Sequence, residues 1–348
     1  MSSDNSYPGV YIEEDATPTL SVSTLPTAVP LINMDSNLTE ILKFNNILDL
    51  YEKFPPYATY DTALAGLRAY FECGGGPCYV TGWKTFIDAI KTLGNRITLV
   101  VGNYHGIKDE VYTLLEDRSK CLFAILDGPA VHIKKSDLNT YQTSASAAVY
   151  YPYLKVGWTD VDVPASAVAA GLYCKNDRTR GVWKSPANVP LPSGYTPKYT
   201  VTDTIQADYS TGKAVNMIRK VDERGSVIWG ARTLDDSDDW RYVSVRRLFN
   251  SVERDLRYAL GTMTFEPNSP LTWEKVRSAA TSYLHRLWKQ GGLAGASENE
   301  AYFVQIGKGV TMSDEDIKQG KMIAKIGLAA ARPAEFIVLQ FTQNMAQA

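Results

Sequence analysis

The sequence lacks the features that mark membrane-spanning, secreted and nucleic-acid-binding chains. It contains no apolar run close to the roughly 18 residues that a transmembrane helix needs, so no direct membrane insertion is expected. Its start, MSSDNSYPGV, has neither the basic nor the apolar segment of a secretory signal. Its 36 Lys and Arg are balanced by 38 Asp and Glu, a formal net charge of −2. Because nucleic-acid-binding proteins usually carry a basic excess, no nucleic-acid partner is expected.

Residues that commonly carry enzyme chemistry are also scarce. The three histidines, His105, His132 and His285, are far apart and have no carboxylate or cysteine at metal-ligand spacing. The four cysteines do not form two closely spaced pairs, so reduced thiols are expected rather than a zinc site. Residues 74–77 (GGGP) lack the Lys and the Ser or Thr of a phosphate-binding loop. The sequence therefore predicts a protein that is not an enzyme and has no catalytic, cofactor-binding or metal-binding residues.

An acidic run at residues 235–239 (DDSDD) allows two interpretations. Clustered carboxylates can bind calcium, but this run lacks the central glycine and the terminal Glu of an EF-hand loop. A solvated turn is the favoured interpretation.

The near-neutral total conceals an uneven distribution of charge. Residues 1–83 carry three basic and ten acidic side chains, a net charge of −7, and residues 84–348 carry 33 basic and 28 acidic ones, a net charge of +5. An acidic front and a basic remainder would let copies of the chain associate head to tail. A monomer with an unevenly charged surface fits the same numbers, and the sequence alone favours that second interpretation.

The hydrophobic pattern predicts an α/β fold followed by an α+β fold. The first 30 residues are rich in Pro and Thr, and residues 9–12 (GVYI) form an extended pattern too short to be stable alone. From about 35 to 135, helix and strand patterns alternate, which is typical of an α/β unit with a largely parallel sheet. Residues 136–215 have few helix signals. The remainder predicts helices over 243–260 and 271–290, with strands over 301–306, 322–330 and 335–341.

Residues 164–190 carry the resemblance to a known family. They contain 170–173 (AGLY), Asp177, 180–184 (RGVWK) and 186–188 (PAN) in order. Further matching blocks, also in order, are 7–14 (YPGVYIEE), 227–234 (VIWGARTL), 240–248 (WRYVSVRRL), 265–268 (FEPN), 287–291 (LWKQG) and 332–338 (RPAEFIV). The chain resembles the contractile tail sheath proteins of phages and R-type pyocins. In its short length it is most similar to the sheath subunits of antifeeding-prophage-type extracellular injection particles. Residues 190–215 depart from the family pattern.

The resemblance implies a three-part organisation. Residues 1–30 would be an extended N-terminal linking arm, 31–215 an outer and middle α/β domain, and 216–348 an inner α+β domain with a C-terminal linking strand. Arms of neighbouring subunits would complete the sheet of the inner domain. The arm residues expected to enter a neighbour's sheet are Val10, Tyr11, Ile12, Glu13 and Glu14. The residues of the C-terminal strand are Phe336, Val338, Leu339 and Phe341.

The function implied by the resemblance is a structural subunit that polymerises as stacked hexameric rings around an inner tube protein. Contraction would drive the tube through a target cell envelope. Baseplate proteins, terminator or cap proteins and possible paralogous sheath subunits are the other implied partners. Assembly would take place in the bacterial cytoplasm, and the product would be a phage tail or a released extracellular particle. The alternatives left open are an α/β nucleotide-binding enzyme and a static tube or capsid component.

Basic residues near the C-terminus form a second set of candidate contacts. Four arginines lie opposite the apolar face of the helix predicted over 243–260, and further basic residues lie on the later helices. Exposed charge pairs, each worth up to about 1 kcal/mol, suit a reversible hold on a tube or on a neighbouring subunit. The candidates are Arg246, Arg247, Arg254, Arg257, Lys275, Arg277, Lys318 and Lys321.

Overall fold

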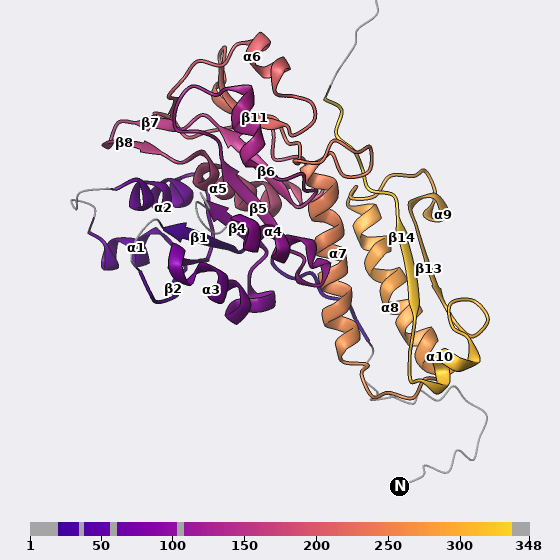
Figure 1. Ribbon diagram of the computed structural model, residues 1–348. Helices are drawn as coiled ribbons and strands as arrows, with labels where there is room; N and C mark the ends of the chain where they lie inside the picture. Colours follow the sequence, from indigo (N-terminus) through magenta and orange to yellow (C-terminus); the bar gives the residue numbers. More distant parts are fainter. Residues whose placement is uncertain (1–19, 35–37, 56–60, 103–107, 336–348) are drawn as a thin grey trace, which may run out of the picture.

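A large sheet covered by helices lies beside a smaller unit built on two long helices (Figure 1). The computed structural model describes residues 20–34, 38–55, 61–102 and 108–335, and the statements below concern these residues. The strands of the large sheet are β1 Pro30–Met34, β2 Leu42–Phe44, β3 Cys78–Gly82, β4 Leu99–Gly102, β5 Phe123–Asp127, β6 Ala147–Tyr151, β9 Val189–Pro190, β11 Val215–Val221 and β12 Gly225–Trp229. Their order is β2-β3-β1-β4-β5-β6-β11-β12-β9. The run from β3 to β11 is parallel, and β2, β12 and β9 add antiparallel edges, so the sheet is mixed.

Helices cover both faces of this sheet because its central strands are apolar on both sides. Strands β4 and β5 are buried at every position, as expected for the middle of a parallel sheet. Helices α1 Ile47–Lys53, α2 Thr62–Glu72 and α5 Ala165–Arg180 pack on one face. Helices α3 Phe86–Leu93, α4 Lys108–Glu116 and α6 Asp203–Asp208 pack on the other. Short 3₁₀ helices occur at Trp83–Thr85, Gly94–Arg96, Arg118–Lys120 and Lys135–Thr140. A second, small antiparallel sheet contains β7 Leu154–Val156, β8 Thr159–Val163 and β10 Thr196–Pro197.

The 16-residue helix α5 corrects the expectation that residues 136–215 contain little helix. Every residue from Ala165 to Cys174 is buried. Helical prediction from sequence depends on an apolar stripe alternating with a polar face, and a helix buried on all sides has no such stripe. The motif residues are therefore recognisable in the sequence, whereas the helix that they form is not.

The smaller unit, which we call the C-terminal unit, spans α7 to β14. It contains α7 Val243–Gly261, α8 Pro270–Lys289, α9 Glu298–Ala301, β13 Tyr302–Ile306, α10 Asp314–Lys318 and β14 Ala324–Leu328. Figure 1 shows α7 and α8 side by side, with β13 and β14 along α8. The two long helices and the two described strands agree with the sequence prediction. Ser313 caps α10, and Asp316 completes the reciprocal capping box.

The boundary predicted at residue 215/216 is wrong, because it falls at the first residue of β11. Strand β11 pairs in parallel with β6 and antiparallel with β12, so both β11 and β12 belong to the large sheet. The C-terminal unit begins only at α7. Pairing between strands more than 60 residues apart leaves no local signal in the sequence. The sequence indicates the boundary only through the return of helix patterns after residue 215.

The described residues 20–30 do not form part of an extended linking arm, contrary to the prediction for residues 1–30. Residues 20–29, which we call the N-terminal strap, lie within their own subunit and lead into β1. Leu20 and Val22 pack against the apolar cluster of α7 and α8. At the other end, the Val29 amide donates to Thr98 Oγ1 at 2.8 Å, just before β4. Only residues before 20 remain available as a linking arm.

Candidate assembly surfaces

The two predicted linking segments lie outside the described residues. Val10, Tyr11, Ile12, Glu13 and Glu14 precede residue 20, and Phe336, Val338, Leu339 and Phe341 follow residue 335. Their pairing with another subunit stays a prediction. The described residues do show the surfaces to which such segments would connect.

Strands β13 and β14 form a two-stranded antiparallel sheet that lies against α8. Tyr302 and Ile306 are buried in the apolar clusters that this sheet shares with α7 and α8. Phe303 and Lys325 are exposed on the opposite face. Among the described residues, no third strand joins either edge of this sheet. Along the two strands each edge therefore presents backbone N–H and C=O groups to which an extended segment could bond. Directly after β14, residues 329–331 are already bonded to residues 292–294.

Arg247 joins three parts of the chain in one buried site. Its Nη2 donates to Asp177 Oδ2 of α5 at 2.6 Å and to the Thr27 carbonyl of the strap at 3.2 Å. Thr27 Oγ1 also donates to Asp177 Oδ2, at 2.6 Å. Burial disfavours the charged guanidinium, but the adjacent carboxylate outweighs burial and raises the pKa of Arg247. The pair is therefore an internal connection between α7, α5 and the strap.

Two more arginines hold the strap through its backbone. Arg254 Nη2 donates to the Pro26 carbonyl at 2.7 Å, and Arg286 Nη2 of α8 donates to the Val22 carbonyl at 2.7 Å. The Leu25 amide donates to Asp255 Oδ1 at 3.2 Å. Burial lowers the pKa of Arg254 and raises that of Asp255. Arginines thus bind the carbonyls of Val22, Pro26 and Thr27, whereas the Val29 carbonyl accepts from the backbone amides of Thr98 and Leu99.

The expectation of an exposed basic face on this helix is wrong for Arg246, Arg247 and Arg254. Their residues are 3%, 3% and 6% exposed, respectively. Arg246 lies over the ring of Trp240, 4.3 Å from its centroid, and burial lowers the pKa of Arg246 to about 10. The face that carries these arginines meets the strap and the first domain instead of solvent. All three are therefore withdrawn as candidates for contact with a tube or a neighbour.

The other basic candidates lie at or near the surface. Arg257 is exposed and pairs with Glu253 on the same helix at 2.8 Å. Arg277 is half-buried and donates to the Ile306 carbonyl at the end of β13. Lys275, Lys318 and Lys321 are exposed. These five residues remain candidates for contacts outside the subunit.

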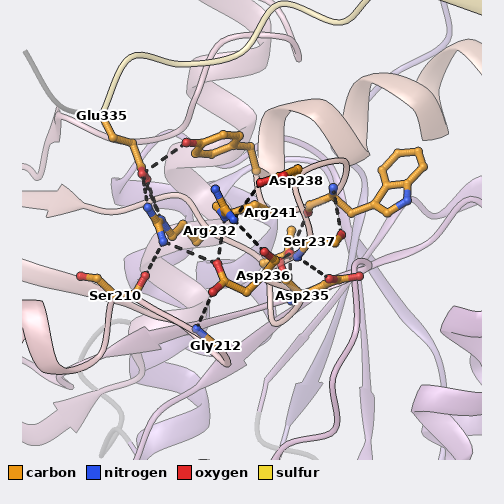
Figure 2. Close-up of polar contacts among 12 residues, drawn as sticks. Ser210, Gly212, Arg232, Asp235, Asp236, Ser237, Asp238, Arg241 and Glu335 are labelled. Carbon is orange, nitrogen blue, oxygen red and sulfur yellow. Dashed lines mark hydrogen bonds and ion pairs between the residues drawn. The ribbon is translucent and has the colours of Figure 1, made fainter.

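A polar network links the end of the described chain to the first domain (Figure 2). Arg232, directly after the large sheet, donates through Nε to Glu335 Oε2 at 3.0 Å and through Nη2 to the same carboxylate at 2.5 Å. Its Nη1 donates to the Ser210 carbonyl and lies 3.7 Å from Asp236 Oδ1. Tyr242 also donates to Glu335, at 3.4 Å. The sequence does not identify Glu335 as the partner of Arg232, although each of these two residues lies in one of the blocks that match the family.

Asp236 belongs to the acidic run of residues 235–239, for which calcium binding is the less favoured of the two interpretations. It accepts hydrogen bonds from the Gly212 amide at 2.9 Å and from Arg241 Nε at 2.8 Å. Arg241 also reaches Asp238 at 3.1 Å. Nearby arginines and a backbone amide thus occupy these carboxylates. Over the described part of the chain, no group of three or more His, Cys, Asp and Glu has the geometry to hold a metal ion.

The carboxyl edge of the parallel strands is where a nucleotide-binding α/β protein would bind its ligand. A cavity of about 820 Å³ lies there, bordered by Asn33 of β1, Gly102 of β4 and Asp127 of β5. Asp160 and Asp162 also line it, and no Lys or Arg is among its described lining residues. Burial raises the pKa of Asp127 to about 6. Because none of these lining residues is a Lys or Arg that could bind a polyphosphate, the cavity does not favour the nucleotide-binding alternative.

Comparisons with known proteins agree with this structural reading. A model of the phage tail sheath C-terminal domain matches residues 235–344. The sheath complex of the extracellular contractile injection system PVC, in its contracted state, is 48% identical and covers 100% of both chains, with a TM-score of 0.91. The contracted helical sheath of the anti-feeding prophage is 43% identical over 97% of this chain and 99% of its own, with a TM-score of 0.83. A prophage major tail sheath protein of Pseudomonas aeruginosa strain UCBPP-PA14 is 26% identical over 192 residues, about half the length of that curated relative.

The whole-chain likeness defines the class of the protein as a structural sheath subunit and not an enzyme. The chain belongs to the sheath protein family of contractile injection systems, and it is similar over its whole length to the PVC and anti-feeding prophage sheaths. The resemblance found in the sequence motifs is thereby confirmed. In the described ranges, no helix combines the length and the apolar character needed to cross a membrane.

Proposed function

We propose that the chain polymerises as stacked hexameric rings around an inner tube protein and contracts to drive that tube through a target cell envelope. The observation that carries the proposal is the full-length, 48%-identical likeness to a sheath complex in the contracted state. Likeness to chains of anti-feeding prophage baseplate structures supports association with a baseplate. The assembly would form in the bacterial cytoplasm, end in a cap or terminator protein, and act as part of a phage tail or a released extracellular particle.

The joints between subunits would be donated strands. The two-stranded sheet of β13 and β14 has open edges within the described residues. An added strand would bind these edges through main-chain hydrogen bonds, which do not require particular side chains. The apolar pattern of residues 336–341 and the short strand pattern of residues 9–12 fit such segments. Residues 1–19 contain four acidic and no basic side chains, so charge would guide the N-terminal segment toward the more basic body of a neighbour. The C-terminal unit would then be the inner domain, facing the tube.

Negative-stain microscopy of the purified protein, alone and with its tube protein, tests the proposal as a whole. We expect sheaths of helically stacked rings, with an extended form in the presence of tube and baseplate and a shorter, wider form after triggering. A static component would give polymers of one fixed diameter and pitch. A protein that remains monomeric at all concentrations and with tube present would contradict the proposal.

Removal of the N-terminal segment tests the strand joint. We expect a chain lacking residues 1–14 to be a folded monomer that forms no sheath, because the strap and both units remain intact while the donated strand is lost. A matched variant, Val10→Asp with Ile12→Asp, keeps the length but places charge on the alternating apolar positions. Size-exclusion chromatography, circular dichroism and microscopy report the outcome. Normal sheath from the deleted chain would rule out the N-terminal joint.

A further inference from the structure

The last described residues of the chain are held against the first domain by two ion pairs. Glu335 bonds to Arg232, and Arg332 Nη2 lies 3.7 Å from Asp239 Oδ1. Both partners belong to the connection between the large sheet and α7. The chain therefore leaves the small sheet after β14, crosses to the other unit, and is fastened there before residue 336. We call Arg232, Tyr242 and Glu335 the C-terminal clamp. Figure 2 labels Arg232 and Glu335.

The clamp is built to fix direction as well as position. Arg232 presents Nε and Nη2 to one carboxylate, and this planar, forked geometry restrains both groups. The Arg232 side chain is only 12% exposed and that of Glu335 only 23%, so solvent screens the pair less than it screens a surface pair. Arg232 is itself fixed by the Ser210 carbonyl and by Asp236. Asp236 is bound in turn to Arg241 and the Gly212 amide.

The position of Glu335 in the sequence gives the clamp its significance. Glu335 immediately precedes residues 336–341, the apolar segment predicted to be donated as a strand. Pro333, two residues earlier, restricts the backbone between the small sheet and the clamp. The point at which the donated segment would begin is thus defined by a side chain of the first domain, not by the sheet that the chain has just left.

We propose that Arg232 is a positioning residue for strand donation, which sets where and in which direction residues 336–341 leave the subunit. This inference rests on the proposed function. Backbone hydrogen bonds already hold residues 329–331 to residues 292–294 and to Ala301, so the clamp fixes the chain between residue 332 and the donated segment. A segment with a fixed starting point loses less conformational freedom on joining a neighbour than one that is free from residue 333 onward. The clamp also connects the donated segment to the large sheet, so movement of the first domain and movement of the strand are coupled.

The test uses one variant on each side of the clamp. Glu335→Ala removes the carboxylate but leaves Arg232 its contacts to Ser210 and Asp236, so the fold should persist. Arg232→Lys keeps the charge but loses the forked geometry. We expect both full-length variants to melt at nearly the wild-type temperature when unassembled. We expect the concentration at which sheath forms to rise at least about tenfold, or about 1.4 kcal/mol per subunit joint. Glu335→Asp, which retains the carboxylate, should recover part of this loss.

A second measurement, the rate of proteolysis next to Glu335, tests the clamp in subunits that are not assembled. Chymotrypsin cleavage after Phe336 in unassembled subunits should be several-fold faster in Arg232→Lys than in wild type, because the cleaved sequence is unchanged and only its fastening differs. Lys91→Glu, which breaks an exposed pair with Asp88, is the matched control and should change neither assembly nor cleavage. Wild-type assembly thresholds in both clamp variants, together with a wild-type cleavage rate in Arg232→Lys, would overturn the inference. A wild-type chain that forms no sheath would contradict the proposed function instead, and the cleavage rates would still decide the clamp.

Discussion

The contact between Arg247 and Asp177 lies where the first domain, the C-terminal unit and the strap meet. The side chains are only 3% and 4% exposed, so little water reaches either charge to replace its partner. Each carboxylate oxygen of Asp177 accepts a hydrogen bond from the guanidinium, and one of them also accepts from Thr27. A buried pair of this kind contributes little net energy when complete, but loss of one member leaves the other charge unpaired.

We therefore expect Asp177→Ala to lower the free energy of unfolding by about 3–5 kcal/mol. Urea denaturation of the full chain, at concentrations below assembly, measures the change. Asp88→Ala is the matched control, since Asp88 forms an exposed pair with Lys91 and should cost about 0–1 kcal/mol. Equal effects of the two substitutions would show that the buried pair does not hold the units together.

The arginines of α7 also show the limit of side-chain prediction from sequence. Spacing along the chain correctly placed Arg246, Arg247 and Arg254 on one face of a helix. It did not reveal that residues more than 200 positions earlier in the chain cover this face. Because the five N–H donors of arginine can bind backbone carbonyls as well as carboxylates, a basic helix face does not by itself identify a solvent-exposed surface.

At the scale of elements, α5 and α2 pack unusually closely at Gly171. A Cβ at this position would lie 2.3 Å from the Tyr70 carbonyl oxygen and 2.9 Å from Cys73 Cβ. Contacts this short with backbone atoms cannot be relieved by a side-chain rotation. The glycine thus permits the helix contact that carries the central family motif.

Substitution of this glycine tests the helix contact. We expect Gly171→Ala to destabilise the subunit by about 1–3 kcal/mol, because the helices must separate to admit the methyl group. Gly157→Ala is the control, since an added methyl group there meets no atom within 4 Å. Thermal unfolding of both variants gives the comparison. A Gly171→Ala protein as stable as the control would indicate that the two helices can separate at little cost.

Elements with a local signature were predicted well from the sequence, and elements defined by distant contacts were not. The long helices α7 and α8 have clear apolar stripes, and α10 has a capping box, so all three were anticipated. Helix α5 has no polar face, and β11 joins the large sheet through β6, which lies far earlier in the chain. The strap resembles a free arm in sequence because its partners are the arginines of other elements. The pairing of Arg232 with Glu335 is likewise not predictable from local sequence, because the two residues belong to different elements.

At the scale of the whole molecule, two exposed lysines lie at the end of α10 and directly after it, in the C-terminal unit. Lys318 ends α10, and Lys321 lies between α10 and β14. If the C-terminal unit faces the tube, these side chains can hold it through weak, reversible charge contacts. Such contacts would be sensitive to salt, because exposed charges are screened within about 10 Å at 0.1 M ionic strength.

Charge reversal tests this arrangement. We expect Lys318→Glu with Lys321→Glu to reduce co-sedimentation of sheath with tube several-fold at low salt, while sheath formation without tube is retained. Lys134→Glu with Lys135→Glu is the control, because both residues are exposed on the first domain. Co-assembly that is equal in both double variants across salt concentrations would reject α10 and its flank as the tube contact.

The strap has a mechanical consequence. It lies between the N-terminal segment and β1, and it is held along its length by Arg286, Arg254 and Arg247. Tension applied to residues before 20 would reach these side chains in turn and pass to α8 and α7. Strand β1, in the middle of the large sheet, would be loaded only after the three guanidinium contacts had failed in succession. If residues before 20 form the proposed joint, a pull on that joint would therefore be borne by α8 and α7 before it reached the large sheet.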